Sequence, residues 1–288
     1  MKRFWCLFFM FWPIAAVIVC WKSPDWNWWF PRGPSGDGAA MSPLGERIDD
    51  LFYMILIITT VTFIGTQTAL GYVLFTGARR SEQPPDAEEA EKAWFTHGSH
   101  NLEVMWSIVP AVILLFIALY QMDVWAEYRV KNQFPAQVRS GPLAEVTARQ
   151  FEWRIRYPGL DEQGNPLPLM RDPQPTDLYT VNDLHLPSGQ PVMIHLRSDD
   201  VQHAFFLPEL RVKQDAVPGL VIPIWFEAKK SADYSLLCAE LCGWGHYKMN
   251  ARLVAEPEDQ WREWLRELHA QQNDDGVPDT EQELQNAN

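Results

Sequence analysis

The stretch Cys238-Ala-Glu-Leu-Cys-Gly-Trp-Gly-His-Tyr-Lys-Met249 decides both the fold and the chemistry of this chain. It places two thiols, one imidazole and one thioether within twelve residues, so that a single loop can surround a metal ion. Sulfur ligands combined with imidazole nitrogen are soft, and they select copper over magnesium, calcium or manganese. Two cysteines four positions apart can each bridge two ions, which leaves His246 and Met249 to complete one ion apiece.

A dinuclear site needs a second imidazole, and His203, 35 residues before Cys238, is the candidate. Three other interpretations of the two cysteines compete with copper. A disulfide suits an extracytoplasmic domain, but not a spacing of four inside a cluster of His and Met. Zinc is disfavoured because Met is a poor zinc ligand and the spacing is not C-x-x-C. A redox pair of the copper-chaperone kind leaves Met249 unexplained, so the pattern favours copper.

The run from Cys238 to Met249 resembles the dinuclear copper A site of cytochrome c oxidase subunit II. The segment Asp200–Gly219 resembles the ligand strand that precedes this site in the same family, and the resemblance covers most of the chain. It implies that Cys238 and Cys242 bridge two copper ions. The other ligands that it implies are His203 and Met249 on one copper, and His246 and the backbone carbonyl of Glu240 on the other.

Two carboxylates acquire roles through this resemblance. The side chain of Glu240 is implied to bind a magnesium ion shared with subunit I, whereas the simpler interpretation is a solvated loop residue. Glu103, at the cytoplasmic end of a predicted span, matches the residue at the entrance of a proton pathway. A carboxylate at that depth is costly unless it has a use. The competing interpretation of Glu103 is an incidental charge at a helix end.

The family carries a Gln-Trp-x-Trp cluster before the metal ligands, and its first Trp is the usual point at which electrons enter. Here the run reads Gln150-Phe151-Glu152-Trp153, so the resemblance assigns electron acceptance to Phe151 and Trp153. Phe keeps an aromatic ring but lacks the indole N–H. We therefore expect a modified route, from a membrane-bound multihaem partner instead of freely diffusing cytochrome c. The alternative is that Phe151 fills a hydrophobic docking patch equally well.

Two uncharged runs predict membrane-spanning helices. Leu51–Thr76 has no charge over 26 residues, and Val104–Tyr120 has none over 17, near the lower limit for a span. The positive-inside rule places Lys2-Arg3 and Arg79-Arg80 in the cytoplasm, so the second half of the chain lies outside it. We predict a multi-pass protein of the cell (inner) membrane, in contact with lipid, whose copper domain faces the periplasm.

The first apolar run, Phe4–Trp21, leaves two interpretations open. A basic start followed by a short apolar stretch describes a signal peptide. The density of aromatic residues, Pro13 and the lack of a small-residue cleavage site favour a retained extra helix. Lipidation of Cys20 is disfavoured because Val19 stands where such signals have a small residue.

From Glu145 onward the pattern is that of a β domain. Apolar and polar residues alternate in Phe151–Tyr157, which predicts a strand with one buried face. Further short strands, separated by Pro- and Gly-rich connections such as 158–189, indicate a β-sandwich. A helix is predicted after the strands, with one apolar face made of Trp261, Trp264, Leu265 and Leu268.

The predicted fold is a hairpin of N-terminal transmembrane α-helices followed by an all-β domain, which the resemblance identifies as a cupredoxin-like Greek-key sandwich. The predicted parts are a signal peptide or extra transmembrane helix (1–21), an extracytoplasmic linker (22–50), the transmembrane hairpin (51–125), the copper A domain (126–256), a C-terminal helix (257–271) and a disordered tail (272–288).

The net charge is −13, with 25 acidic and 16 basic residues from Glu127 onward. This balance excludes nucleic acid as an expected partner and favours a basic redox protein. The sequence has no C-x-x-C-H motif, so no fused cytochrome c domain is predicted.

The resemblance implies the electron-accepting subunit of a respiratory cytochrome c oxidase. Electrons from a c-type cytochrome would pass through the dinuclear centre to haem in subunit I, where oxygen is reduced with proton pumping, and subunit III is a further expected partner. A quinol oxidase subunit II without copper is the first competing function, and the intact ligand set argues against it. A membrane-anchored copper chaperone is the second, and the two spans together with Glu103 argue against it.

Overall fold

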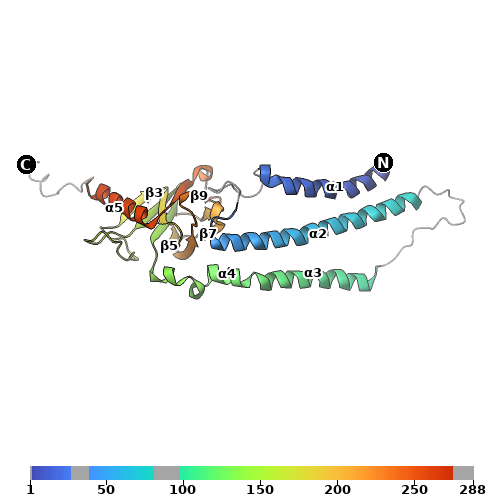
Figure 1. The fold of residues 1–288 in the computed structure, drawn as a ribbon, viewed down its shortest axis with the longest axis horizontal. Coiled ribbons are helices and arrows are strands. Elements are labelled where there is room, and N and C mark those ends of the chain that lie inside the picture. Colours follow the sequence, from blue (N-terminus) through green and yellow to red (C-terminus); the bar gives the residue numbers. More distant parts are fainter. Residues whose placement is uncertain (1, 27–38, 81–97, 275–288) are drawn as a thin grey trace, which may run out of the picture. The chain divides into compact units, whose positions relative to one another are not determined.

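The computed structural model describes residues 2–26, 39–80 and 98–274 of the chain. The chain divides into two compact units: a helical unit within 1–29 and 49–123, and a β unit within 30–48 and 124–288. Figure 1 follows the order of the elements, from the helices in blue to green to the strands and the last helix in green to red.

Two stretches of helix are long and apolar enough to cross a membrane. They are residues 43–77 in α2 (Pro43–Arg80), and residues 100–129, which comprise α3 (His100–Tyr120) and α4 (Met122–Arg129). Their apolar side chains are mostly exposed in the isolated chain, which suits helices surrounded by lipid. The predicted N-terminal spans are therefore confirmed. A third helix, α1 (Lys2–Lys22), contains Pro13; its cleavage or retention stays a prediction.

Helix α2 begins at Pro43, before the uncharged run used to predict it. Proline suits the first turn of a helix because its fixed φ is helical and its missing N–H is not needed there. The residues before α2 are attached to the β unit: the amide of Met41 donates to the carbonyl of Glu209 at 2.8 Å, and Met41 is buried. Part of the stretch 22–50, predicted as linker, is thus ordered structure, and 27–38 lie outside the described residues.

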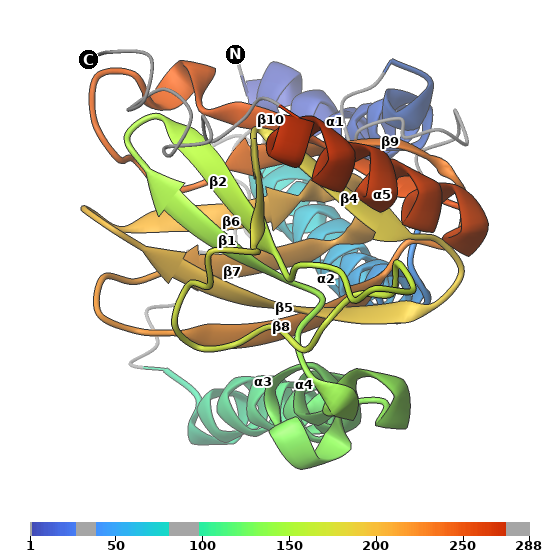
Figure 2. The same ribbon diagram turned by 90° about the vertical axis from the view of Figure 1, so that its left-hand side faces the viewer.

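The β unit is a sandwich of two five-stranded sheets. The first sheet has the order β3-β2-β1-β5-β8, with bounds Leu178–Val181, Glu152–Tyr157, Ala144–Arg149, Pro191–Ser198 and Ile222–Glu227. The second has the order β4-β10-β9-β6-β7, with bounds Asp183–Pro187, Asn250–Glu256, Ala232–Cys238, His203–Leu207 and Val212–Ala216. The chain passes repeatedly from one sheet to the other (Figure 2), which confirms the predicted cupredoxin-like Greek-key sandwich.

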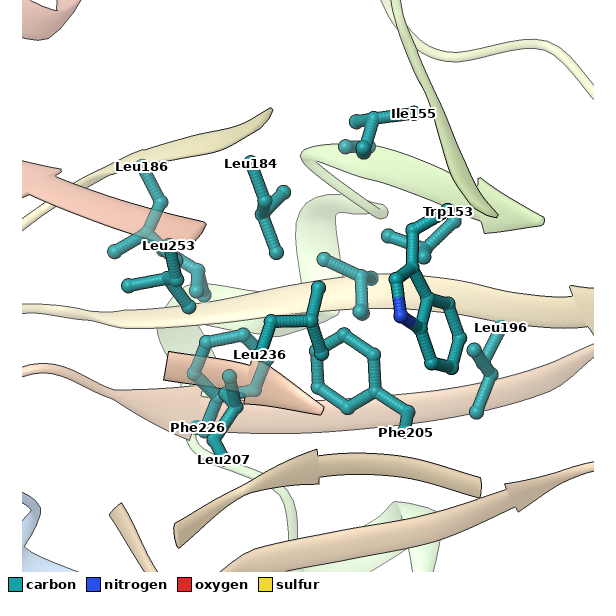
Figure 3. Close-up of a cluster of buried hydrophobic side chains, with 14 of the residues drawn as sticks. Trp153, Ile155, Leu184, Leu186, Leu196, Phe205, Leu207, Phe226, Leu236 and Leu253 are labelled. Atoms are coloured by element: carbon teal, nitrogen blue, oxygen red, sulfur yellow. The ribbon is translucent and has the colours of Figure 1, made fainter. Parts of the chain in front are cut away.

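The core lies between the two sheets and is made by alternate residues of each strand. Burial alternates strictly along β5, the pattern of a strand with one face inward. Fully burying a large apolar side chain contributes about 1.5–3 kcal/mol, so this layer dominates the stability of the unit. Figure 3 shows side chains from both sheets meeting there, among them Trp153, Ile155, Leu196 and Phe226 from the first sheet and Leu184, Phe205, Leu207 and Leu236 from the second.

Two strands fall in the segment 158–189, which the sequence predicted as a connection. The six prolines of this segment had suggested a connection without strands. The strands β3 and β4 are separated by Asn182 alone, whose φ is 58° at the point where the chain passes from the first sheet to the second; asparagine tolerates this left-handed conformation better than most residues. Beyond it, β4 pairs in parallel with β10 and completes the second sheet.

Helix α5 (Glu258–Asp274) packs on β4 and β10 (Figure 2). Trp261 and Leu265 are buried against the core, and Trp264 stacks on His185 with ring centroids 3.8 Å apart. The predicted apolar face of this helix thus contacts the sandwich. The helix extends to Asp274, so the first three residues of the predicted disordered tail (272–288) are helical. Residues 275–288 lie outside the described residues.

Candidate metal centre

Strand pairing brings the metal-binding candidates to one end of the second sheet. His203 opens β6 and Cys238 closes the neighbouring β9, and the register pairs Phe205 with Cys238. On the other side of β9, the amide of Cys238 donates to the carbonyl of Met249 at 3.2 Å, just before β10 begins. Residues 35 and 11 positions away from Cys238 in the chain therefore become its neighbours.

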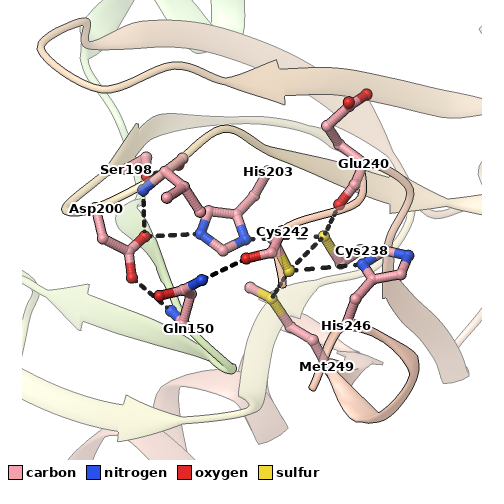
Figure 4. Close-up of polar contacts among 10 residues, drawn as sticks. Gln150, Ser198, Asp200, His203, Cys238, Glu240, Cys242, His246 and Met249 are labelled. Atoms are coloured by element: carbon pink, nitrogen blue, oxygen red, sulfur yellow. Dashed lines mark hydrogen bonds and ion pairs between the residues drawn. The ribbon is translucent and has the colours of Figure 1, made fainter. Parts of the chain in front are cut away.

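Three side-chain donors and one carbonyl surround the two thiols (Figure 4). The two sulfurs are 4.0 Å apart. The Cys238 sulfur lies 3.8 Å from Nδ1 of His203 and 3.2 Å from the carbonyl oxygen of Glu240. The Cys242 sulfur lies 3.6 Å from Nδ1 of His246 and 3.8 Å from the sulfur of Met249. All six residues predicted as copper ligands thus meet in one cluster, with the thiols at its centre.

The cluster is largely shielded from solvent. His203 is fully buried, Cys242 and Met249 are buried, and Cys238 and His246 are partly exposed. Packing therefore holds the potential ligands of a metal ion in place, as a preorganised site requires.

Asp200 and Gln150 support the cluster, and the sequence analysis did not single them out. Oδ1 of Asp200 lies 2.9 Å from Nε2 of His203, and Oδ2 accepts the amide of Gln150 at 2.8 Å. The side-chain amide of Gln150 donates to the carbonyl of Cys242. A carboxylate on one imidazole nitrogen fixes the ring and directs the other nitrogen to a metal, here Nδ1. The spacing Asp200-x-x-His203 is the signal in the sequence from which this pair could have been found.

The pKa values of the two thiols are shifted in opposite directions. Burial raises the pKa of Cys238, but His203 and nearby backbone groups outweigh burial and lower that pKa to about 6. Burial and the charge of Cys238 raise the pKa of Cys242 to about 11. Cys238 therefore loses its proton more readily than Cys242, which keeps its own more strongly. A metal ion that binds both sulfurs must displace the proton of Cys242.

The two carboxylates with predicted roles lie in different units. The backbone of Glu240 faces Cys238, whereas its side chain points away from the sulfurs (Figure 4). Glu103 lies in the first turn of α3 in the helical unit and is exposed in the isolated chain. Of these two residues, only Glu240 contacts the sulfur cluster, and it does so through its backbone carbonyl.

The aromatic pair predicted to accept electrons is divided between the surface and the core. Phe151 is partly buried, and its ring packs edge-to-face on Trp244 of the loop, with centroids 5.2 Å apart. Trp153 is fully buried, with its ring centroid 6.3 Å from that of His203. A docked protein could not touch Trp153, so of the two only Phe151 is accessible from outside.

The donor set fits copper. Two thiolates, two imidazoles and one thioether are the soft-to-intermediate ligands that copper prefers, and hard cations would be poorly served. His203, Cys238 and Cys242 offer ligand atoms that all lie within 4.8 Å of one another. The two thiols stand between the remaining donors.

Comparisons with known proteins identify the family. The family model for the periplasmic domain of cytochrome c oxidase subunit II matches residues 160–255, and the model for its transmembrane domain matches residues 37–124. The alternative cytochrome c oxidase subunit 2 of Bradyrhizobium diazoefficiens is 30% identical over 268 residues, which cover 88% of each chain. A quinol oxidase subunit 2 of Bacillus cereus is 27% identical over 264 residues, covering 90% of this chain and 80% of the relative.

Among solved structures, the periplasmic domain of subunit II of cytochrome oxidase from Bradyrhizobium japonicum is similar, with 23% identity and a TM-score of 0.37, covering 44% of this chain and 93% of that domain. The family places the β unit in the periplasm, anchored by the two apolar helices, in a complex with other oxidase subunits. The chain belongs to the cytochrome c oxidase subunit II family and is a subunit of a haem-copper oxidase.

Proposed function

We propose that this chain is the subunit of a respiratory cytochrome c oxidase that accepts electrons from a c-type cytochrome at a dinuclear copper centre. The observation that carries the proposal is the cluster in which Cys238 and Cys242, with sulfurs 4.0 Å apart, are surrounded by two imidazoles, a thioether and a carbonyl. If these donors served only to pack the buried end of the sandwich, apolar residues would stabilise it better. The donor cluster therefore indicates a binding role.

Each residue of the cluster has a distinct task in this proposal. Cys238 and Cys242 would hold both ions through their sulfurs, and copper bound there would supply one-electron chemistry. The outer ligands would be His203 and Met249 on one ion, and His246 and the carbonyl of Glu240 on the other. Asp200 holds the ring of His203, and Gln150 holds the loop through the carbonyl of Cys242.

The relatives include quinol oxidase subunits, which makes a copper-free subunit the main alternative. A quinol oxidase delivers electrons from within the membrane and needs no such cluster on subunit II. Purified complex should contain two coppers per copy of this chain and oxidise a reduced c-type cytochrome faster than quinol. Quinol oxidation without cytochrome c oxidation, by a complex free of these coppers, would contradict the proposal.

A membrane-anchored copper chaperone is the second alternative. A chaperone must release its metal, whereas the buried His203, Cys242 and Met249 favour retention. Copper that stays bound during turnover supports the oxidase, and transfer of copper to another apoprotein supports the chaperone.

The further partners in this proposal are subunit I, which would receive the electrons at its haem, and subunit III. The complex would lie in the inner membrane, reduce oxygen and pump protons. The side chain of Glu240, which points away from the sulfurs (Figure 4), would bind a magnesium ion shared with subunit I. Oxygen ligands suit magnesium as sulfur ligands do not.

Met249→Leu is expected to retain both coppers and to change their reduction potential. Met249 is buried 3.8 Å from the sulfur of Cys242, and leucine preserves its volume. A thioether is a weak ligand that tunes copper more than it holds it. A redox titration of the copper spectrum tests this expectation, and loss of one copper ion would contradict it.

Glu103→Gln is expected to slow oxygen reduction several-fold while copper content stays unchanged. Glu103 lies in the first turn of α3, and the change removes its proton-carrying group without altering its size. Turnover measured over a range of cytoplasmic pH tests the expectation. If turnover is the same as in the wild type throughout, Glu103 is only a helix-end charge.

A further inference from the structure

The loop between the metal-binding residues carries large apolar side chains on its outer surface. Leu241, Trp244 and Tyr247 are 79%, 78% and 81% exposed. Exposed apolar residues that gather in one place mark a surface that a partner covers. The loop therefore has two sides: one that faces the sulfur cluster and one that faces outward.

Trp244 differs from its exposed neighbours because two contacts hold its ring. The ring packs edge-to-face on Phe151, with centroids 5.2 Å apart and planes at 68°. The ammonium group of Lys248 lies 4.7 Å from the ring centroid. Among the described residues, no ring contact joins Tyr247 to Phe151. An exposed Trp that is already fixed loses little conformational entropy on binding, and such residues dominate the affinity of many interfaces.

Phe151 supports Trp244 from beneath the loop. A Cβ atom on Gly245 would lie 2.5 Å from Cδ2 of Phe151, and one on Gly243 would lie 3.1 Å from its Cζ. The two glycines are therefore needed for the loop to lie directly on the ring. A protein that approaches from outside meets Trp244 before it meets Phe151.

Carboxylates from neighbouring turns adjoin this surface. Asp199 and Asp200 are exposed in the turn before β6, and Asp200 is joined to the loop through Gln150. Lys248, the only Lys or Arg between Cys238 and Met249, packs on Trp244. The surface is thus an aromatic centre with mainly acidic surroundings, complementary to an apolar centre with basic surroundings.

We propose that Trp244 is the principal contact of the electron donor, a c-type cytochrome whose exposed haem edge is ringed by lysines. This inference rests on the proposed function and names the residue that the donor must meet. Trp244 lies two residues after Cys242 and two before His246. Only this loop therefore separates a donor that binds on Trp244 from the sulfur cluster.

The test uses the purified oxidase complex and a soluble, lysine-rich c-type cytochrome in its reduced form. Stopped-flow measurement at low ionic strength gives the second-order rate of electron delivery. We expect Trp244→Ala to lower that rate at least about tenfold, or about 1.4 kcal/mol, and Trp244→Phe to lower it less. Tyr247→Ala, which removes an equally exposed ring from the same loop, is the matched control and should lower it less than about twofold.

Copper content, the copper spectrum and the reduction potential are measured on each variant, and they should match the wild type. A role of Trp244 in shaping the loop would change the spectrum or the potential, and that result would overturn the inference. Equal losses in Trp244→Ala and Tyr247→Ala would overturn it as well. Loss of another subunit from the Trp244→Ala complex would identify the surface as a subunit contact and reject it. If the wild type accepts no electrons from the cytochrome, the proposed function itself fails.

Discussion

Cys242→Ser is expected to abolish the copper signal in which one unpaired electron is shared by two ions. The two sulfurs lie 4.0 Å apart, and each lies within 4.0 Å of its own pair among the remaining donors, so each would bridge in the proposed centre. A serine hydroxyl is a harder and far less acidic ligand than a thiol, and it cannot supply the second bridge. Paramagnetic resonance of the oxidised complex should show at most one copper with a localised electron. Cys238→Ser is expected to give the same result.

Cys20→Ser is the matched control for this experiment. Cys20 is an exposed cysteine of α1 in the helical unit, so its replacement removes a thiol without touching the cluster. The shared signal should persist in full. A shared signal that survives Cys242→Ser would show that Cys242 does not bridge, and the proposed ligand arrangement would then be wrong.

Arg156→Met is expected to destabilise the β unit by about 3–5 kcal/mol, the usual cost of removing one partner from a buried ion pair. Nη1 of Arg156 lies 2.7 Å from Oδ2 of Asp177, and Nη2 lies 3.2 Å from Oε1 of Glu145. All three side chains are buried. The substitution would leave Asp177 buried without a cation, and Glu145 with only Arg197 at 3.7 Å. Chemical unfolding of the detergent-solubilised protein, followed by near-ultraviolet circular dichroism, gives the change in free energy.

Arg252→Met is the control, since it removes an arginine from a surface ion pair of similar geometry. Arg252 lies 2.6 Å from Asp183, but its side chain is 57% exposed. Exposed pairs contribute about 0–1 kcal/mol. If both variants lose a similar free energy of unfolding, then burial does not determine how much the Arg156 ion pairs contribute to stability.

The sequence was most informative where chemistry is local. The ligands from Cys238 to Met249 share one loop, so their spacing alone indicated a copper site, and His203 followed from the need for a second imidazole. The uncharged runs predicted the two spans because a lipid environment admits few alternatives. The alternation in Phe151–Tyr157 predicted β2, which the structure places at 152–157.

The missed features depend on contacts between distant segments. Gln150 reaches both Asp200 and Cys242, 50 and 92 residues away, and no local pattern encodes such a network. The strands on either side of Asn182 were hidden because prolines in the same segment suggested a connection. Trp244 carries no local signal of its role, because its contact with Phe151 depends on the fold.

The central claim is that this chain holds two coppers that act as one redox centre. The most direct measurement is the copper content of the purified complex together with its paramagnetic resonance spectrum in the oxidised form, with the copper of any other subunit subtracted. We predict two coppers per copy of this chain and a hyperfine pattern from one unpaired electron shared by two equivalent nuclei. A single copper with a localised electron, or no copper bound to this chain, would contradict the account.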